Sequence, residues 1–532
     1  MNSKLCESLD IEFPLFAFSH CRDVIVEVSK AGGFGVLGAA GHTPESLEIE
    51  MNWIDEHIDG KSYGVDLIVP NSIDSKESSN LSPEDIEARI PPEHKAYVES
   101  ILAQAGIDTR DLWQRPKAGY GDNMRETGAN AILDVAFSHP IKMIVNALGV
   151  PPLFMMQRAK QAGVAVGALT GAKEHAIKHC ESGVDVLIVS GTEAGGHCGE
   201  VSTLVLVPEV LDAIGDKFPD VAVLAAGGIV TGKQMAACMA MGAHGAWCGS
   251  VWLTTSEAET NPAVKEKMLS ANSRQTVRSK SRTGKYTRQL RSQWTDAWQS
   301  EDAPPPLPMP LQSLVSEPAL RKIDKLAESG DAGARNLATY WVGQGVGLMN
   351  TSVSARTVVY DFMEDYAAAV ERLGNTGQDK PLLPWHGVPM VQRILTTVPA
   401  EMPKLISANR NLDTYRQWAP VVTDLPVTAE AEDYQGPLVG DTPALPMNWC
   451  DVLMQSVDGH VDGAVVHDGE RQQHLHLLLK CDVEKDLERF LAAGGYQVYK
   501  WLQTMQLSTA RFADRMAFRN MNSPTDLDYP AA

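Results

Sequence analysis

One histidine stands in a run of glycines that directly follows an apolar stretch of the chain. The run extends from Gly191 to Gly199, and the apolar stretch covers residues 184–190. The imidazole of His197 suits proton uptake near neutrality because the ordinary pKa of histidine is about 6.5. The neighbouring Gly195 and Gly196 leave space for a ligand against the backbone. The pattern indicates a catalytic base, and a structural histidine bonded to a loop carbonyl fits it equally well.

Two later apolar runs also end in glycine. Residues 221–226 lead into Gly227 and Gly228, and residues 245–248 lead into Gly249 and Ser250. A single cluster of this kind is usually only a tight turn. Three such strand ends in succession favour backbone amides that hold an anion, assisted by the positive ends of the helices that follow. The sequence therefore predicts a phosphate site, and beside a lone acid–base residue such a site suits a cofactor that performs the redox chemistry itself.

Eight strand-like runs alternate with helical patterns through the first half of the chain. The expected strands are 11–18, 35–38, 63–69, 141–146, 164–169, 184–190, 221–226 and 245–251. The expected helices are 22–31, 44–57, 152–162, 173–182, 207–217 and 232–241. Strands that are apolar throughout and joined by helices indicate a parallel sheet buried on both faces. We predict an α/β fold, a (β/α)8 TIM barrel whose loops after strands seven and eight bind phosphate. A doubly wound open sheet is the alternative.

The remaining segments extend this barrel. An insertion at about residues 70–130 is expected to form helices over the barrel mouth, with a decorative surface insertion as the alternative. The basic run 265–291 is interpreted as a solvated helix face, with attraction of an anionic substrate as the alternative. The composition changes after residue 375, which predicts a barrel domain over 1–375 and an additional α+β region of unknown role over 376–532. His474 and His476 lie in that region two residues apart, but no third ligand is evident, so we predict no metal site.

Composition excludes several classes of protein. The 532 residues carry a net charge of −21, which argues against binding nucleic acid. The eight cysteines are scattered without a Cys-x-x-Cys pair, as expected in a reducing compartment. No run has the roughly 20 apolar residues needed to span a bilayer. We therefore expect a cytoplasmic protein without a membrane segment.

The glycine-rich segments resemble the nitronate monooxygenase family, formerly called 2-nitropropane dioxygenases. The resemblance is carried by residues 27–38, 193–197, 226–229, 249–250, 276–284 with Arg288, and 343–345, and it covers about residues 10–370. It implies a TIM barrel that holds FMN non-covalently and oxidises alkyl nitronates with O2 to a carbonyl compound and nitrite. It also implies that His197 is the catalytic base. The FMN contacts that it implies are Asp66, Gly195, Gly196, Gly227, Gly228, Gly249, Ser250 and Gln344.

Two positions depart from the family pattern. Asp66 stands where the family usually has asparagine, and an ionised carboxylate cannot donate the hydrogen bond of an amide. Residues 16–20 also differ from the usual Ala-Pro-Met of the first strand. Two other functions therefore stay open: an FMN-dependent NAD(P)H reductase of the enoyl-thioester type, and a scaffold or partner module in a biosynthetic assembly. We expect a small-molecule substrate and O2, and we leave open a homo-oligomer or a protein partner bound through the C-terminal region.

Overall fold

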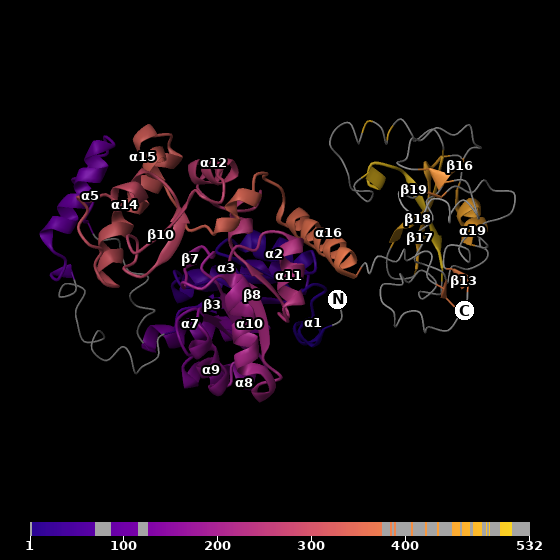
Figure 1. Cartoon of the computed structure of the whole chain (residues 1–532), viewed down its shortest axis with the longest axis horizontal. Helices are drawn as coiled ribbons and strands as arrows, with labels where there is room; N and C mark the ends of the chain where they lie inside the picture. Colours follow the sequence, from indigo (N-terminus) through magenta and orange to yellow (C-terminus); the bar gives the residue numbers. More distant parts are fainter. Residues whose placement is uncertain are drawn as a thin grey trace. The chain divides into compact units, whose positions relative to one another are not determined.

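The computed structural model describes the barrel region almost completely and parts of the C-terminal region. The described residues are 3–69, 87–114, 126–374, 384–385, 388–389, 406–407, 421–422, 434–435, 449–457, 460–468, 472–480, 486, 489 and 501–512. The chain divides into two compact units, residues 1–370 and 371–532. Figure 1 draws both, coloured along the sequence.

Eight parallel strands close into a barrel in the order β1-β2-β3-β4-β5-β6-β8-β9, which confirms the predicted TIM barrel. The strands are β1 (Leu15–Ser19), β2 (Phe34–Gly38), β3 (Tyr63–Leu67), β4 (Met143–Asn146), β5 (Ala165–Thr170), β6 (Val186–Ser190), β8 (Ala222–Ala226) and β9 (Gly245–Cys248). Each observed strand corresponds to one predicted run, and none extends beyond its run by more than one residue. The last run was predicted to continue as strand to Val251, but residues 250–254 instead form the 3-10 helix η2 (Ser250–Thr254).

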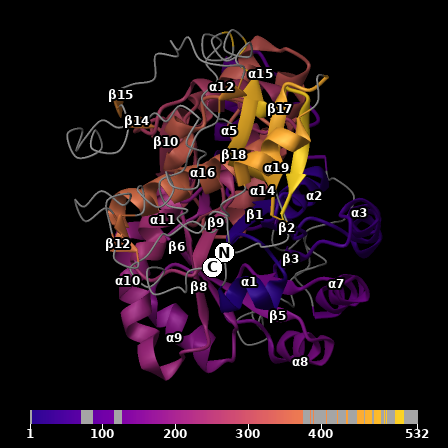
Figure 2. The ribbon, with the colours of Figure 1, turned by 90° about the vertical axis from the view of Figure 1, so that its right-hand side faces the viewer.

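Helices cover the outer face of the strands (Figure 2). They are α2 (Arg22–Lys30), α3 (Pro44–His57), α7 (Glu126–Ser138), α8 (Leu153–Ala162), α9 (Lys173–Glu181), α10 (Thr203–Ile214) and α11 (Gly232–Ala240). α3 begins where Thr43 and Ser46 form a capping box with Pro44 in the first turn. The short α1 (Lys4–Leu9) places Leu5 and Leu9 in the same buried cluster as inward side chains of the strands, so the barrel interior is a packed core.

A further group of helices and strands follows the barrel strands in the sequence, and we call it the second layer. It contains α12 (Pro262–Ser270), β10 (Thr276–Ser279), β11 (Thr287–Leu290), α13 (Gln293–Ala297), α14 (Leu311–Glu328) and α15 (Ala332–Leu337). The helix α5 (Pro92–Gln104) of the insertion lies beside α14 (Figure 1). The Tyr97 hydroxyl donates to the Ala297 carbonyl at 2.6 Å, and His94 Nε2 lies 2.9 Å from the Pro305 carbonyl oxygen. The described part of the insertion therefore packs on the segment after the barrel, and α5 is helical as predicted.

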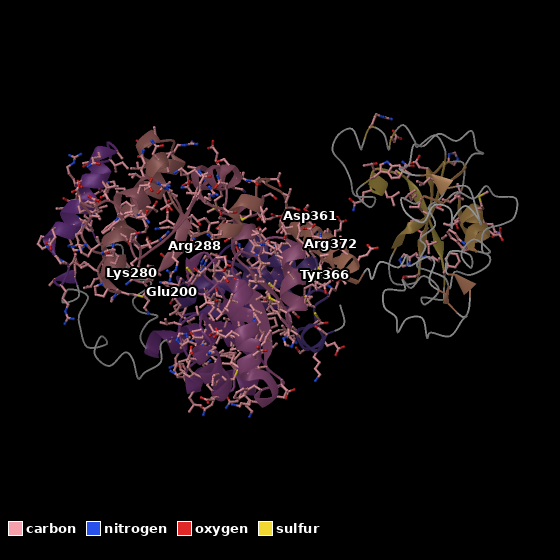
Figure 3. The ribbon with its side chains drawn as sticks, in the orientation of Figure 1. Glu200, Lys280, Arg288, Asp361, Tyr366 and Arg372 are labelled. Atoms are coloured by element: carbon pink, nitrogen blue, oxygen red, sulfur yellow. The ribbon has the colours of Figure 1, made fainter. Side chains whose placement is uncertain are left out.

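The interpretation of the basic run as a solvated helix face is wrong for most of its length. Only α12 is helical, whereas β10 and β11 pair as an antiparallel hairpin that carries Lys280 and Arg288 (Figure 3). The turn contains Gly284 at φ +86°, a conformation that favours glycine. β11 also pairs with the short β7 (Gly196–His197), which completes a three-stranded sheet. The strand conformation therefore rests on the local hairpin together with the pairing of β11 to a distant segment.

The C-terminal unit contains a four-stranded sheet and a helix, in agreement with the predicted α+β region. The sheet order is β16 (Tyr434–Gln435), β18 (Gln472–Lys480), β17 (Gly463–His467) and β19 (Leu507–Arg511), and the helix is α19 (Trp449–Ser456). Alternate residues of β17 enter two different apolar clusters, Ala464 and Val466 with Trp449, and Val465 with Trp501. This unit therefore has apolar packing on both faces of its own sheet. β18 carries His474 and His476, whose side chains lie outside the described residues.

The other described elements are short strands and connecting helices. They are β12 (Pro384–Trp385), β13 (Val388–Pro389), β14 (Ile406–Ser407), β15 (Val421–Val422), η1 (Gly215–Lys217), η3 (Gln344–Leu348) and α16 (Ala355–Gly374).

Candidate active site

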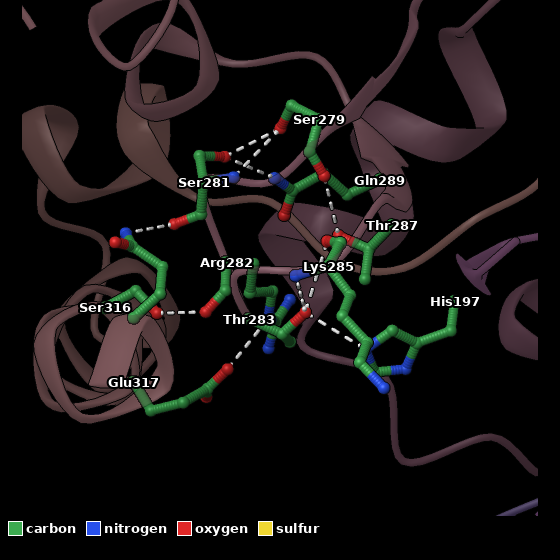
Figure 4. Close-up of polar contacts among 11 residues, drawn as sticks. His197, Ser279, Ser281, Arg282, Thr283, Lys285, Thr287, Gln289, Ser316 and Glu317 are labelled. Carbon is green, nitrogen blue, oxygen red and sulfur yellow. Dashed lines mark hydrogen bonds and ion pairs between the residues drawn. The ribbon is translucent and has the colours of Figure 1, made fainter. Parts of the chain in front are cut away.

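His197 is exposed on β7, at the carboxyl-terminal side of the barrel strands. β7 is held antiparallel to β11, with His197 opposite Thr287 and Gly196 opposite Arg288. The imidazole Nε2 lies 3.0 Å from the Thr283 hydroxyl oxygen (Figure 4). That oxygen accepts a hydrogen bond from the Lys285 backbone N–H at 3.4 Å, and its proton can be donated to the Lys285 carbonyl at 3.3 Å. This network favours a tautomer in which Nε2–H donates to Thr283, so Nδ1 keeps its lone pair.

The surroundings of His197 favour its neutral form. Partial desolvation lowers the pKa of its imidazole below the ordinary value, and the positive charges of Lys285 and Arg282 lower it further. A histidine that is neutral near pH 7 can accept a proton. The site therefore favours an uncharged imidazole beside two cations.

The loop that carries His197 is anchored to α10 through Glu193. Its Oε2 accepts hydrogen bonds from the Thr203 backbone N–H at 2.9 Å and from the Thr203 hydroxyl at 3.0 Å. The same hydroxyl lies 3.0 Å from the Ala226 carbonyl oxygen and 3.1 Å from that of Gly227. Thr203 thus joins the loop after β6 to the loop after β8. This contact was not predicted, because nothing in the local pattern pairs Glu193 with a helix start ten residues away.

Three of the predicted glycines are required by the packing of the protein itself. Gly227 and Gly228 have φ of +103° and +73°. A Cβ on Gly227 would lie 2.8 Å from Thr203 Oγ1, and one on Gly228 would lie 2.9 Å from Glu193 Cβ. A Cβ on Gly195 would lie 2.8 Å from the Val342 carbonyl carbon. These contacts bring the loops after β6 and β8 and the segment before η3 close together.

The loops after β8 and β9 nevertheless offer free donors. The backbone N–H groups of Gly227, Gly228 and Gly249 have no acceptor among the described residues. The space beside two glycines is open, because a Cβ on Gly196 would have no atom within 4 Å and one on Gly249 would meet Phe18 only at 3.7 Å. Free backbone amides of this kind can serve as donors to an anion. We call these loops, Gly227–Gly228 and Gly249–Ser250, the amide corner.

Ser250 and Gln344 connect this corner to the segment after the second layer. The Ser250 hydroxyl oxygen accepts from the Gly343 N–H at 2.8 Å, which leaves its proton free for another acceptor. The Gln344 backbone N–H donates to the Glu193 carbonyl at 2.9 Å. The structure therefore brings together the predicted residues on the loops after β6, β8 and β9 and at the start of η3.

Asp66 lies apart from the amide corner. β3 and β8 are four strands apart in a barrel of eight, so they occupy opposite walls. Asp66 pairs in register with Gly38 and Val145, and Val145 belongs to the interior cluster, which places position 66 on the inward face. The residue is only 4% exposed. Burial raises the pKa of this carboxyl well above its usual range, so the protonated, donating form is favoured.

Gln234 is a further residue that supports the amide corner. Its Oε1 accepts from the N–H groups of Val230 and Thr231 at 2.9 and 3.1 Å, and its Nε2 donates to the Gly228 carbonyl at 2.8 Å. The side chain therefore sets the shape of the loop after β8. Thr231 and Gln234 have the spacing of a capping box, a sequence signal that could have identified this role.

One group of side chains has the proximity of metal ligands. Ligand atoms of Cys21, Asp23 and Glu259 lie within 4.8 Å of one another. Burial raises the pKa of the Cys21 thiol, and its Sγ lies 3.1 Å from the Glu257 carbonyl oxygen. A metal binds the thiolate, which this environment disfavours.

These features fit a phosphorylated redox cofactor of the flavin type. The amide corner supplies donors for a phosphate, the Ser250 hydroxyl supplies one more, and the buried Asp66 carboxyl faces inward on the opposite wall. Fold and site together define the class of the protein: a TIM-barrel enzyme with glycine-rich loops after its last two strands and His197 at its rim.

The chain belongs to the nitronate monooxygenase family, whose family model matches residues 3–365. The family makes the protein a flavin-dependent oxidoreductase and confirms the predicted resemblance. A relative from Mycobacterium tuberculosis (strain ATCC 25618 / H37Rv), named "Putative monooxygenase Rv1533", is 50% identical over 70% of this chain and 98% of its own length. A "Probable nitronate monooxygenase" of Staphylococcus aureus (strain JH9) is 24% identical over 66% of this chain and 93% of its own length.

Solved structures share the barrel. The nitroalkane oxidase from Streptomyces ansochromogenes has a TM-score of 0.56 at 23% identity, and the match covers 70% of this chain and 100% of that one. FabK from Thermotoga maritima has a TM-score of 0.51 at 22% identity, with 70% and 98% covered. At these identities the likeness establishes the fold.

Among the described helices, none combines the length and the apolar character needed to cross a bilayer.

Proposed function

We propose that the protein is an FMN-dependent enzyme that oxidises alkyl nitronates, or related small carbon acids, with O2. The observation that carries this proposal is the position of His197, a neutral imidazole held by Thr283 next to the loops of the amide corner. The whole site lies within residues 1–375, and no activity is assigned to residues 376–532. The substrate is a small molecule, and the reaction yields a carbonyl compound and nitrite.

Each predicted residue has a role in this proposal. Gly227, Gly228, Gly249 and Ser250 bind the phosphate of FMN through backbone amides and one hydroxyl, and the neutral carboxyl of Asp66 donates a hydrogen bond to the cofactor from the opposite wall. Gly195, Gly196 and Gln344 shape the backbone between the cofactor and His197. When bound, FMN supplies the redox chemistry by accepting electrons from the substrate and passing them to O2.

The proton chemistry belongs to the side chains. With Nε2 engaged by Thr283, His197 Nδ1 takes the proton from the carbon beside the nitro group of a neutral nitroalkane. The nitronate formed is an anion, and the charges of Lys285 and the imidazolium stabilise it. A substrate supplied as nitronate has already lost this proton.

The test compares His197→Asn with the wild-type protein. Both proteins should purify yellow and release FMN on heating, because the asparagine leaves the amide corner intact. The value of kcat/KM for a neutral nitroalkane should fall by about 10²- to 10⁴-fold, the usual contribution of a positioned base, while turnover of the preformed nitronate falls less. His175→Asn, a change in an exposed histidine on α9, is the matched control. Undiminished turnover of neutral nitroalkanes by His197→Asn would remove the histidine from this role.

The same preparation tests the reductase alternative. Anaerobic addition of a nitronate should bleach the visible absorbance of the oxidised flavin, because the cofactor takes up the electrons of the substrate. Rapid bleaching by NADPH with none by nitronate would instead favour an NAD(P)H-dependent reductase of enoyl thioesters.

A further inference from the structure

The two departures from the family pattern lie next to each other at the carboxyl-terminal end of the barrel strands. They are Asp66 on β3 and residues 16–20, which end in His20 just after β1. Gly38, the last residue of β2, lies between them. It pairs in register with Asp66, and His20 Nδ1 lies 2.7 Å from its carbonyl oxygen. The roles proposed above give His20 no function.

The imidazole of His20 lies on the inward face of the strands, over Gly38. Val36, two residues before Gly38 on the same strand, belongs to the interior cluster, so a side chain at position 38 would also point inward. A Cβ on Gly38 would lie 2.6 Å from His20 Nδ1 and 2.9 Å from Phe18 Cε2, so these two rings fill that space. Asp66 follows on the same face, one strand spacing of about 4.8 Å further along the sheet.

The contacts of His20 decide which of its nitrogens is free. A carbonyl oxygen only accepts, so Nδ1–H donates to Gly38, and in the neutral imidazole Nε2 then keeps its lone pair. Phe18 holds the ring edge-on, with the two centroids 5.2 Å apart and the planes at 76°. The side chain is exposed, and no donor among the described residues reaches Nε2. His20 therefore offers an acceptor to the barrel mouth.

Asp66 offers a donor beside this acceptor. Burial raises the pKa of its carboxyl and so favours the protonated form. The residue is 4% exposed, and within the described part of the chain no hydrogen bond or ion pair reaches the carboxyl. A buried polar group without a partner costs free energy, which a ligand can recover. An acceptor next to a donor matches a ring edge on which an N–H group stands beside a carbonyl.

Phe18 connects this pair to the amide corner. A Cβ on Gly249 would lie 3.7 Å from Phe18 Cδ1, and the Phe18 ring stacks on Trp247 with the centroids 6.0 Å apart. The strands follow one another in the order β8, β9, β1, β2 and β3, so the inward wall is continuous from the amide corner to Asp66. FMN carries a phosphate at one end and a pyrimidine ring at the other. One molecule can therefore contact both regions of this wall.

We propose that His20 is a cofactor-binding residue whose Nε2 accepts a hydrogen bond from the N3–H group of the FMN pyrimidine ring, next to the donating carboxyl of Asp66. The flavin N3–H stands between two carbonyl groups, so its edge complements an acceptor beside a donor. The inference rests on the proposed function for the identity of the cofactor, and it is tested by binding without turnover.

The test uses the full-length protein loaded with FMN, and the probe is 3-methyl-FMN, in which a methyl group replaces the hydrogen on N3. The protein is equilibrated with an equal excess of FMN and 3-methyl-FMN, separated from free flavin by gel filtration, and heated. The ratio of the two flavins released, measured by chromatography, gives the ratio of their affinities. The wild type should prefer FMN by at least about tenfold, or about 1.4 kcal/mol, because the analogue cannot donate to His20.

Two variants separate the hydrogen bond from the space that the methyl group occupies. His20→Phe keeps an aromatic ring and lacks an acceptor, so its preference for FMN should fall to about threefold or less. His20→Gln keeps an acceptor oxygen and should retain the preference of the wild type. His175→Phe, a change in an exposed histidine on α9, is the matched control and should also retain it.

An undiminished preference for FMN in His20→Phe would overturn the inference, as would equal affinity of the wild type for the two flavins. If His20→Phe binds too little flavin for the ratio to be measured, His20→Gln decides, and a lost preference in that variant would also overturn the inference. A wild-type protein that oxidises nitronates without the preference refutes this inference alone. A protein that shows the preference and does not oxidise nitronates refutes the proposed function alone.

Discussion

The amide corner and the β10–β11 hairpin border the same histidine, but the corner presents backbone groups and the hairpin presents side chains. The corner offers backbone amides on glycine-rich loops, and its conformation depends on φ values of +103° and +73° at Gly227 and Gly228. The hairpin offers charged and hydroxyl side chains on regular strands that pair with β7. In the proposed function the corner therefore holds the phosphate in a tight shape, whereas the hairpin sets the protonation of His197.

This difference determines how each region responds to mutation. The donors of the corner cannot be removed singly, because they are peptide groups, so a substitution there changes the position of several at once. The side chains of the hairpin can be removed one at a time while the backbone stays in place. Changes at the corner should abolish cofactor binding, and changes at the hairpin should alter rates and pH dependence.

The largest effect is expected for Gly228→Ala. The new Cβ would lie 2.9 Å from Glu193 Cβ in addition to the strain of a positive φ. The loop must shift, so the protein should retain about tenfold less FMN, measured as flavin absorbance per chain after gel filtration. Gly163→Ala is the control, because its φ of +67° imposes similar strain and no atom lies within 4 Å of its Cβ. Full flavin retention by Gly228→Ala would show that the corner tolerates displacement.

An intermediate effect is expected for Thr283→Val. The substitution keeps the shape of the side chain and removes the hydroxyl that lies 3.0 Å from His197 Nε2. Loss of one such hydrogen bond should lower kcat/KM for a neutral nitroalkane by about three- to tenfold, with flavin binding unchanged. Thr283→Ser restores the hydroxyl and should restore the rate. If serine fails to rescue the rate, the effect of valine is one of packing.

The smallest effect is expected for Lys285→Gln, and it is a shift in pH dependence. The charge of Lys285 contributes to the lowered pKa of His197, after desolvation. Removing a positive neighbour favours the imidazolium, so the pKa rises and the base is available only at higher pH. The acidic limb of the kcat/KM profile should move upward by about a few tenths of a pH unit, and less at high salt. A downward shift would contradict the assignment, and Lys178→Gln should leave the profile unchanged.

The barrel could be predicted because the patterns that indicate its strands and helices each lie within a short segment of the sequence. Apolar runs that end in glycine alternate with helical patterns, so residues 221–228 already indicate a buried strand followed by bare backbone. The basic run was predicted incorrectly from the same kind of pattern. Residues 276–290 become strands because β10 and β11 pair with each other and β11 also pairs with the distant β7, where Thr287 lies opposite His197.

The sequence by itself determined the barrel, the three glycine-rich strand ends and the histidine among them, because hydrophobic period and glycine placement act within a few residues. The tertiary structure alone decided which groups meet: Thr283 with His197, 86 residues apart, Glu193 with Thr203, and Arg278 with Arg288. It also decided that Asp66 faces inward, where burial raises the pKa of its carboxyl. Contacts between distant segments follow from how the chain closes in space, and no local pattern records them.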